Sequence, residues 1–464
     1  MVSGTNNNIG GMGMVQTSGP HETLLEQDDQ YVWHSMKPYN PKATIVATKA
    51  EGSWVTDADG KRYLDAMAGL WCVNVGYGRT ELAEAAYEQL KEMAYFPLSQ
   101  SHVPAIKLAE KLNEMLGDDY VIFFSNSGSE ANETAFKIVR QYHQQKGDHN
   151  RYKIVSRYRA YHGNSAGALA ATGQAQRKYK YEPLAPGFIH VSPPDSYRDE
   201  TNVTDPKELS SVKEIDRVMT WELSETIAAM IMEPIITGGG VLVPPEGYMK
   251  AAKEVCEKHG ALLIVDEVIC GFGRTGKPFG FMNYGVKPDI ITMAKGITSA
   301  YLPLSATAVR KDIYESFKGA EEYDYFRHVN TFGGNPAACA LALKNLEIME
   351  KEKLFERSRD LGEQLLNDLN NLLQDHPYVG NVRGKGLLVG IELVKDKNTK
   401  EPLETGLVNQ VIASCKQEGI IIGKNGATVA GYNNVLTLAP PLNIEQKDLQ
   451  FIIKTLTESL NKIR

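Results

Sequence analysis

The sequence predicts an α/β protein whose large domain is built on a mostly parallel sheet. The first observation is the run Ala261-Leu-Leu-Ile-Val-Asp-Glu267, an apolar, β-branched segment of strand length that ends in two acids before a glycine-rich stretch. The second is Pro288-Asp-Ile-Ile-Thr-Met-Ala294, a similar segment that ends at Lys295. Buried parallel strands have this composition, and open α/β sheets bind ligands at the carboxyl ends of their strands. The third is length, because 464 residues suit a large domain with a smaller one.

Composition is that of an ordinary globular protein and argues against several classes. Hydrophobic residues make up 42% of the chain and charged residues 23%. The net charge of -7 shows no clustering by sign, so we expect neither a nucleic acid nor a membrane as partner. No apolar run approaches the length of a transmembrane helix. The polar, glycine-rich start lacks the blocks of a signal peptide, and residues 1–22 are predicted to be a flexible leader.

The cysteines indicate a reducing compartment. They are 5 in number and scattered, with no Cys-x-x-Cys motif and no histidine at metal-binding spacing. We therefore predict reduced core thiols in a cytoplasmic protein without a metal site. The cysteines are Cys72, Cys256, Cys270, Cys339 and Cys415.

Residues 23–75 are predicted to begin the smaller domain. A short acidic helix is expected over 23–30, followed by two short strands around an Asp-Gly turn within 52–65. Trp71 then lies among glycines, where the backbone bends. Amphipathic helices are expected over 81–93 and 104–116, the second with proline in its first turn.

Residues 76–345 are predicted to form the large domain, in which these two helices precede a strand over 120–124 and a loop over 125–133 that enters a helix. Ser127 and Glu130 have the spacing of a capping box. Small residues and a helix N-terminus together form an outline of a phosphate cradle, although a capping box alone only starts a helix.

Further strands of this domain end in polar residues. A strand over 153–156 precedes Tyr161-His-Gly163, and another over 228–232 ends at Glu233, an acid-base or hydrogen-bonding candidate. The polar, acidic segment 192–226 is interpreted as a surface excursion. A second glycine-rich loop contains Thr331 and leads into a helix over 336–353.

Residues 346–464 are predicted to complete the smaller domain. They contain a charged helix over 356–373 and strands within 379–394, 419–423 and 435–441. An amphipathic helix over 444–463 closes the chain.

Asp266 and Lys295 suggest a chemistry. An amine that condenses with a carbonyl, beside a carboxylate that holds a ring nitrogen protonated, is what a pyridoxal phosphate enzyme needs. Taken separately, the acid could cap a turn and the lysine could be solvated.

The run from Leu263 to Gly276, followed by Ala-Lys-Gly around Lys295, closely resembles the signature of class III (subgroup II) pyridoxal phosphate aminotransferases. Almost the whole chain from about Gln30 shares this resemblance. It implies the fold type I architecture of pyridoxal phosphate-dependent transferases, which have an α/β large domain and a smaller α+β domain built from both chain ends.

The resemblance also assigns roles to residues that match family motifs. Lys295 would hold the cofactor and move a proton, and Asp266 would pair with the pyridine nitrogen. The remaining cofactor contacts are a phosphate loop, two residues on the ring faces, a histidine beside them and an acid near the phenolic oxygen. These are Ser127, Gly128, Ser129, Tyr161, Val268, His162 and Glu233. Thr331 would reach the phosphate in the partner subunit, which implies a homodimer with shared active sites and leaves a tetramer open.

Within the family, the chain is similar to the ω-amino acid and amine:pyruvate branch. The resemblance implies ping-pong transfer of an amino group from an amine or ω-amino acid to a small keto acid, with pyruvate as first choice. Predicted substrate contacts are Trp71, Phe96, Tyr161 and Lys424. Members that accept pyruvate usually carry an arginine near Lys424, and lysine lacks its two-pronged geometry, so the contact for the acceptor carboxylate stays open.

Two alternatives remain at this stage. The first is an adenosylmethionine-8-amino-7-oxononanoate aminotransferase of biotin synthesis, because related sequences share every cofactor motif. The second is a pyridoxal phosphate-binding protein that has lost catalysis, which the intact Lys295 disfavours. Fold alone does not fix the substrate.

Overall fold

The computed structural model describes residues 21–36, 40, 44–199, 203–426, 428–429 and 431–463. The predicted leader, residues 1–22, lies outside the described residues apart from its last two, which begin α1 (His21–Tyr31). The predicted division into domains stays a prediction. Among the described residues, no helix has the length and apolar character needed to cross a membrane.

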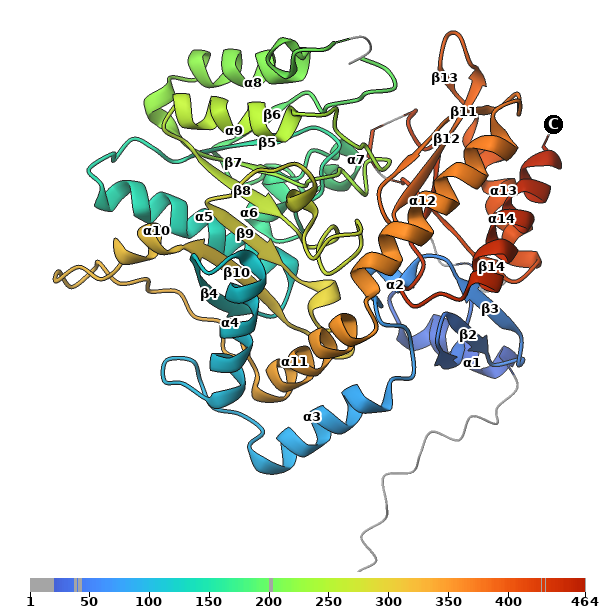
Figure 1. The fold of residues 1–464 in the computed structure, drawn as a ribbon, viewed down its shortest axis with the longest axis horizontal. Helices are drawn as coiled ribbons and strands as arrows, with labels where there is room; N and C mark the ends of the chain where they lie inside the picture. The colour runs from blue at the N-terminus through green and yellow to red at the C-terminus, as the bar shows by residue number, and fades with distance from the viewer. Residues whose placement is uncertain are drawn as a thin grey trace, which may run out of the picture.

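A seven-stranded sheet organises the larger half of the molecule (Figure 1). Every neighbouring pair from β9 to β6 is parallel, while β10 runs antiparallel to both β4 and β9. The predicted mostly parallel α/β sheet is therefore confirmed. In sheet order the strands are β4 (Tyr120–Ser125), β10 (Ser305–Arg310), β9 (Ile290–Met293), β8 (Leu262–Asp266), β7 (Ile227–Met232), β5 (Lys153–Arg157) and β6 (Phe188–Val191).

Successive residues of β8 face opposite sides of this sheet, as the period of a strand requires. Ile264 packs in one core with α5 (Gly128–Gln145), and Val265 packs in the other with α8 (Ser210–Trp221) and α9 (Tyr248–Lys258). Both faces are buried, which explains why the strands are continuously apolar.

The interpretation of 192–226 as a surface excursion is wrong in its second half, which forms α8. Val212, Ile215 and Met219 recur at helical spacing and are buried. Figure 1 shows α8 lying along α9 over one side of the sheet. The many charged residues of this segment occupy the outer face of the helix and obscured its apolar stripe.

Two smaller sheets lie outside the large one, and the first of them combines strands from both ends of the chain. The first has the order β1 (Ala47–Glu51), β2 (Trp54–Asp57), β3 (Arg62–Asp65) and β14 (Ile420–Ile421), with β14 parallel to β3. The second has the order β11 (Val379–Gly384), β12 (Val389–Asp396), β16 (Val435–Leu438) and β15 (Gly423–Lys424), and β13 (Glu401–Pro402) pairs with β12. The strand predicted over 419–423 is thus two short strands, one in each sheet.

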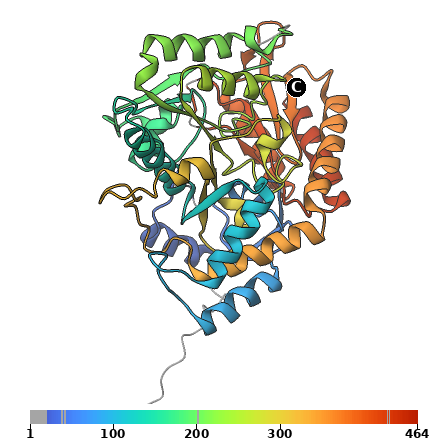
Figure 2. The same ribbon diagram turned by 60° about the vertical axis from the view of Figure 1, so that its left-hand side comes forward.

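Helices cover the sheets and connect them. Figure 2 shows α3 (Thr80–Glu92) and α11 (Pro336–Lys351) side by side along one edge of the molecule, where they pack together. The other α-helices are α2 (Ala68–Trp71), α4 (Val103–Leu116), α6 (Ala166–Ala171), α7 (Ala175–Lys178), α10 (Lys311–Glu315), α12 (Leu354–Leu373), α13 (Thr405–Gln417) and α14 (Gln446–Asn461). All the cysteines are free, and each of them except Cys72 is buried.

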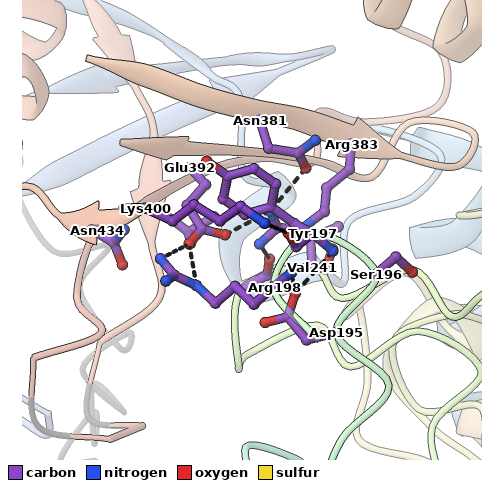
Figure 3. Close-up of polar contacts among 12 residues, drawn as sticks. Asp195, Ser196, Tyr197, Arg198, Val241, Asn381, Arg383, Glu392, Lys400 and Asn434 are labelled. Carbon is purple, nitrogen blue, oxygen red and sulfur yellow. Dashed lines mark hydrogen bonds and ion pairs between the residues drawn. The ribbon is translucent and has the colours of Figure 1, made fainter. Parts of the chain in front are cut away.

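A buried cluster of charged residues joins the second small sheet to the large one (Figure 3). The Glu392 carboxylate accepts from Arg198 Nη2 at 2.5 Å and from Arg383 Nη1 at 2.7 Å. Burial favours the protonated acid, but the two guanidinium groups prevail and hold the pKa of Glu392 below its usual value. Arg383 also donates to the carbonyls of Gly240 and Val241, at 2.6 and 2.9 Å, in the loop that follows β7. The small sheet therefore holds that loop in place.

Gly362 provides a test of how closely α12 packs. A Cβ at this residue would lie 2.1 Å from the carbonyl oxygen of Gly386. We expect Gly362→Ala to lower the free energy of unfolding by about 1–3 kcal/mol through overpacking, although alanine usually stabilises a helix interior. The measurement is urea denaturation followed by circular dichroism.

Gly406 is the matched control, because it lies in α13 and a Cβ there meets nothing within 4 Å. Gly406→Ala should leave the free energy of unfolding unchanged or raise it by up to about 1 kcal/mol. Equal stabilisation by both substitutions would contradict the close packing of α12.

Candidate active site

One pocket lies at the carboxyl ends of β7, β8 and β9, beside the N-terminus of α5. Most of the predicted cofactor residues line it, although they come from distant parts of the sequence. They are Gly128, Ser129, Tyr161, His162, Glu233, Asp266, Val268 and Lys295. The two strands that the sequence predicted before Asp266 and Lys295 are parallel neighbours, β8 and β9, and Asp266 pairs with Thr292 across them.

Lys295 follows β9 in a strained backbone conformation. Its φ is 50°, in the left-handed region that residues with a side chain rarely adopt. Burial lowers the pKa of the Lys295 amine, and the negative charge of Asp266 opposes this effect only in part. The amine lies 5.8 Å from the centre of the Trp71 ring. A lysine with a lowered pKa has a larger fraction of neutral amine, the form that attacks a carbonyl carbon.

The Asp266 carboxylate is buried and held by three donors. Asn132 Nδ2 donates at 2.9 Å, His162 Nδ1 at 2.8 Å and the backbone N–H of Val268 at 3.0 Å. In the contact between the Asp266 carboxylate and His162, the carboxylate is the natural acceptor and Nδ1 the donor. The Thr292 hydroxyl donates to Asn132 Oδ1 at 2.7 Å and so fixes the orientation of the Asn132 amide. These contacts leave the carboxylate little freedom to rotate.

The N-terminus of α5 lines the pocket beside Val268. The Ser127 hydroxyl accepts from the N–H of Glu130 at 3.2 Å, as predicted, and the Glu130 carboxylate accepts from the N–H of Asn126 at 2.7 Å. A Cβ on Gly128 would lie 3.0 Å from the methyl groups of Val268, so glycine allows the close approach. Unpaired N–H groups and the positive end of the helix dipole favour an anion here.

Glu233 lines the pocket and is hydrogen-bonded to the backbone of Tyr161. Its carboxylate accepts from the backbone N–H of Tyr161 and of Thr237, each at 3.1 Å. Burial raises the pKa of Glu233, and the nearby Asp266 raises it further. Glu233 is therefore a candidate hydrogen-bond donor as well as an acceptor.

Several predicted residues do not line this pocket within one chain. Ser127 caps α5, and Phe96 is 43% exposed. Thr331 is exposed, and its carbonyl accepts from the hydroxyl of Tyr95 at 2.8 Å. Lys424 donates to Asn409 on α13 at 2.7 Å, and burial lowers the pKa of its amine. Trp71 lies near the lysine but is not part of the lining.

Sequence reasoning missed Asn132 and Asn164. Asn132 lies four residues after Gly128 on α5, so the spacing of a helix turn could have placed it on the same face. Asn164 donates its N–H to the Ser129 hydroxyl at 3.1 Å and accepts from that hydroxyl at 3.0 Å. No sequence pattern indicated the contact of Asn164 with Ser129, because it joins a loop to the first turn of α5, 35 residues away along the chain.

Comparisons of sequence agree with this arrangement. Residues 35–460 match the family model described as aminotransferase class-III. An uncharacterized aminotransferase of Bacillus subtilis is 71% identical over 443 residues, which cover 96% of this chain and 98% of that protein. The taurine–pyruvate aminotransferase of Bilophila wadsworthia is 42% identical, with coverage of 95% and 97%.

Solved structures agree as well. The crystal structure of a Bacillus anthracis aminotransferase is 67% identical and superposes with a TM-score of 0.94, covering 95% of this chain and 98% of that one. A thermostable (S)-enantioselective omega-transaminase from Thermomicrobium roseum is 41% identical, with a TM-score of 0.87 and the same coverage. From the sequence, the fold and the pocket together, the chain belongs to the class III aminotransferase family.

Proposed function

We propose that this aminotransferase is a pyridoxal phosphate-dependent ω-aminotransferase that moves an amino group from an amine or ω-amino acid to pyruvate in a ping-pong reaction. The observation that carries the proposal is the placement of Lys295 and Asp266 at the ends of adjacent parallel strands, facing the N-terminus of α5. Relatives named for taurine–pyruvate and putrescine–pyruvate transfer support pyruvate as acceptor. The free cysteines support a cytoplasmic location.

The pocket fits pyridoxal phosphate. Lys295 offers an amine for its aldehyde, Asp266 a carboxylate for its ring nitrogen, and the N-terminus of α5 a place for its phosphate. Tyr161 and Val268 would contact the ring faces, while Glu233 would lie near the phenolic oxygen. The bound cofactor supplies an electron sink for negative charge on the amine-bearing carbon of the substrate.

Lys295, Asp266 and Trp71 have different roles in the proposed reaction. The Lys295 amine removes the proton from the amine-bearing carbon and later returns one, a role for which its lowered pKa suits it. Asn132 and His162 hold the Asp266 carboxylate in place, where it would face the ring nitrogen of the cofactor. Trp71 is proposed as a wall of the substrate space next to the amine.

We also propose a homodimer in which Thr331 and Phe96 complete the site of the partner subunit. Apolar side chains gather on the surface around Thr331, where Tyr95 and Phe332 meet edge to face at 6.3 Å. Phe332 is 66% exposed and Val329 75% exposed. Exposed apolar groups that cluster in this way are typical of a protein interface.

The half-reaction tests the proposed function. The protein loaded with pyridoxal phosphate is mixed separately with an aryl-alkyl amine, β-alanine, taurine and adenosylmethionine, and then with pyruvate or 2-oxoglutarate. We expect the cofactor absorbance to bleach with an amine or ω-amino acid and to return with pyruvate. Bleaching by adenosylmethionine alone would replace this proposal with the biotin-pathway enzyme, and an unchanged spectrum would favour a non-catalytic protein.

Substitution of Lys295 tests its role. Lys295→Ala should lower the rate of transfer by at least about 1,000-fold, because the amine and its proton transfer are both removed. Binding of pyridoxamine phosphate, which has no aldehyde, should persist and is measured by fluorescence. Lys287→Ala, which changes an exposed lysine paired with Asp119, is the control. Normal turnover in the Lys295 variant would refute the mechanism.

The lowered pKa of Lys295 predicts a pH dependence. The pKa falls because burial disfavours the charged amine, so the neutral form predominates from a lower pH than in a solvated lysine. The rate at which the apo-protein captures pyridoxal phosphate should therefore rise with pH, with a midpoint below about 10.4. Nα-acetyl-lysine, whose ε-amine is free, gives the reference curve in solution. A midpoint equal to that of the free amine would show that the side chain is solvated.

A further inference from the structure

Arg177 is a basic residue next to the pocket to which neither sequence reasoning nor the proposed mechanism gives a role. It lies on α7, half-buried, and its guanidinium carbon is 4.7 Å from the centre of the Tyr161 ring. Tyr161 itself lines the pocket. Arg177 is not itself among the lining residues, so the Tyr161 ring is the contact that the cavity and this cation share.

The guanidinium is held in place but not neutralised. Its Nε donates to Gln174 Oε1 at 2.6 Å, and Nη1 meets the sulfur of Met36, a weak acceptor, at 2.9 Å. No carboxylate of the described residues forms an ion pair with it, and burial lowers the pKa of Arg177. A partly desolvated guanidinium without an anion is costly, and stacking on an aromatic ring offsets only part of that cost. An anion from outside the chain would supply the missing charge.

Three other cations of the described part of the chain already have partners. Arg159 pairs with Asp195 at 2.9 Å and donates to the carbonyl of Gly239. Lys178 donates to the carbonyl of Ala170 at 3.2 Å and lies 3.2 Å from His190 Nε2. Lys424, the residue that the sequence suggested for the acceptor carboxylate, is bonded to Asn409 instead.

We propose that Arg177 binds the acid group of the substrate, a carboxylate or a sulfonate, and so selects donors and acceptors that carry such a group. The proposal rests on the proposed function and names the substrate class of the same pocket. Two parallel N–H groups of a guanidinium match two oxygens of either acid. The contacts with the Tyr161 ring and with Gln174 hold the guanidinium in one orientation before the substrate binds. Donor and acceptor would use the same contact in turn, as a ping-pong reaction requires.

Binding of unreactive acids tests the proposal directly. Propionate and ethanesulfonate carry the acid group without an amine, and their dissociation constants are measured by calorimetry on the cofactor-loaded protein. We expect Arg177→Gln to raise the dissociation constants of both acids by about 10- to 100-fold. The dissociation constants of Arg177→Lys should lie between those of that variant and the wild type. A loss for one acid only would identify which of the two the site selects. Lys178→Gln, one residue away, is the control and should bind both acids normally.

Kinetics separate recognition from a structural role. In Arg177→Gln, KM for β-alanine and taurine should rise by a similar factor, while kcat changes less. The half-reaction of 1-phenylethylamine, which has no acid group, is the internal reference. Equal losses with all three donors would mean that the substitution disturbs Tyr161, and no loss with the acids would also overturn the proposal. A loss confined to Lys424→Gln would assign the contact to Lys424. A wild-type protein unreactive with every donor would instead refute the proposed function itself.

Discussion

The carboxylate of Asp266 is the point on which the site depends. It accepts hydrogen bonds from α5, from the loop after β5 and from its own chain two residues ahead, through Asn132, His162 and the N–H of Val268. Because each donor belongs to a different segment, the carboxylate fixes their relative positions. The N-terminus of α5, the ring of Tyr161 and the amine of Lys295 are thereby brought around one cavity.

The two consecutive acids at the end of β8 have opposite uses. Asp266 faces the pocket, whereas Glu267 turns away and accepts from the backbone N–H groups of Gly280 and Phe281 at 2.8 and 2.7 Å. Burial raises the pKa of Glu267 to about 8, while those N–H groups favour its ionised form. Arg274 is similarly buried and donates to the carbonyls of Leu387 and Pro440. The protein thus uses buried ionisable groups to connect loops as well as for chemistry.

The parallel sheet and the residues proposed to hold the cofactor could be predicted from the sequence. An apolar strand and the polar residue that follows it are consecutive in the chain, as in Ile-Val-Asp-Glu and Met-Ala-Lys. The helix α8 was missed since charges hid its apolar spacing. Arg177 was missed for another reason: nothing in Gln174-Ala-Gln-Arg177 indicates that the guanidinium stacks on Tyr161. Contacts between side chains distant along the chain arise from packing and leave no local pattern in the sequence. The proposed roles of Phe96 and Thr331 depend on the second subunit of the proposed homodimer.

The pairing of β3 with β14 sets an order on biosynthesis. The N–H of Leu64 donates to the carbonyl of Gly419 at 2.8 Å, so one of the first strands to leave the ribosome has a partner among the last. At about 5–20 residues per second the wait is roughly 20–70 seconds, and every strand of the central sheet is synthesised within it. Until then β3 presents an unpaired edge, the feature that most readily pairs with other chains. Translation that stops before Gly419 would leave that edge open permanently.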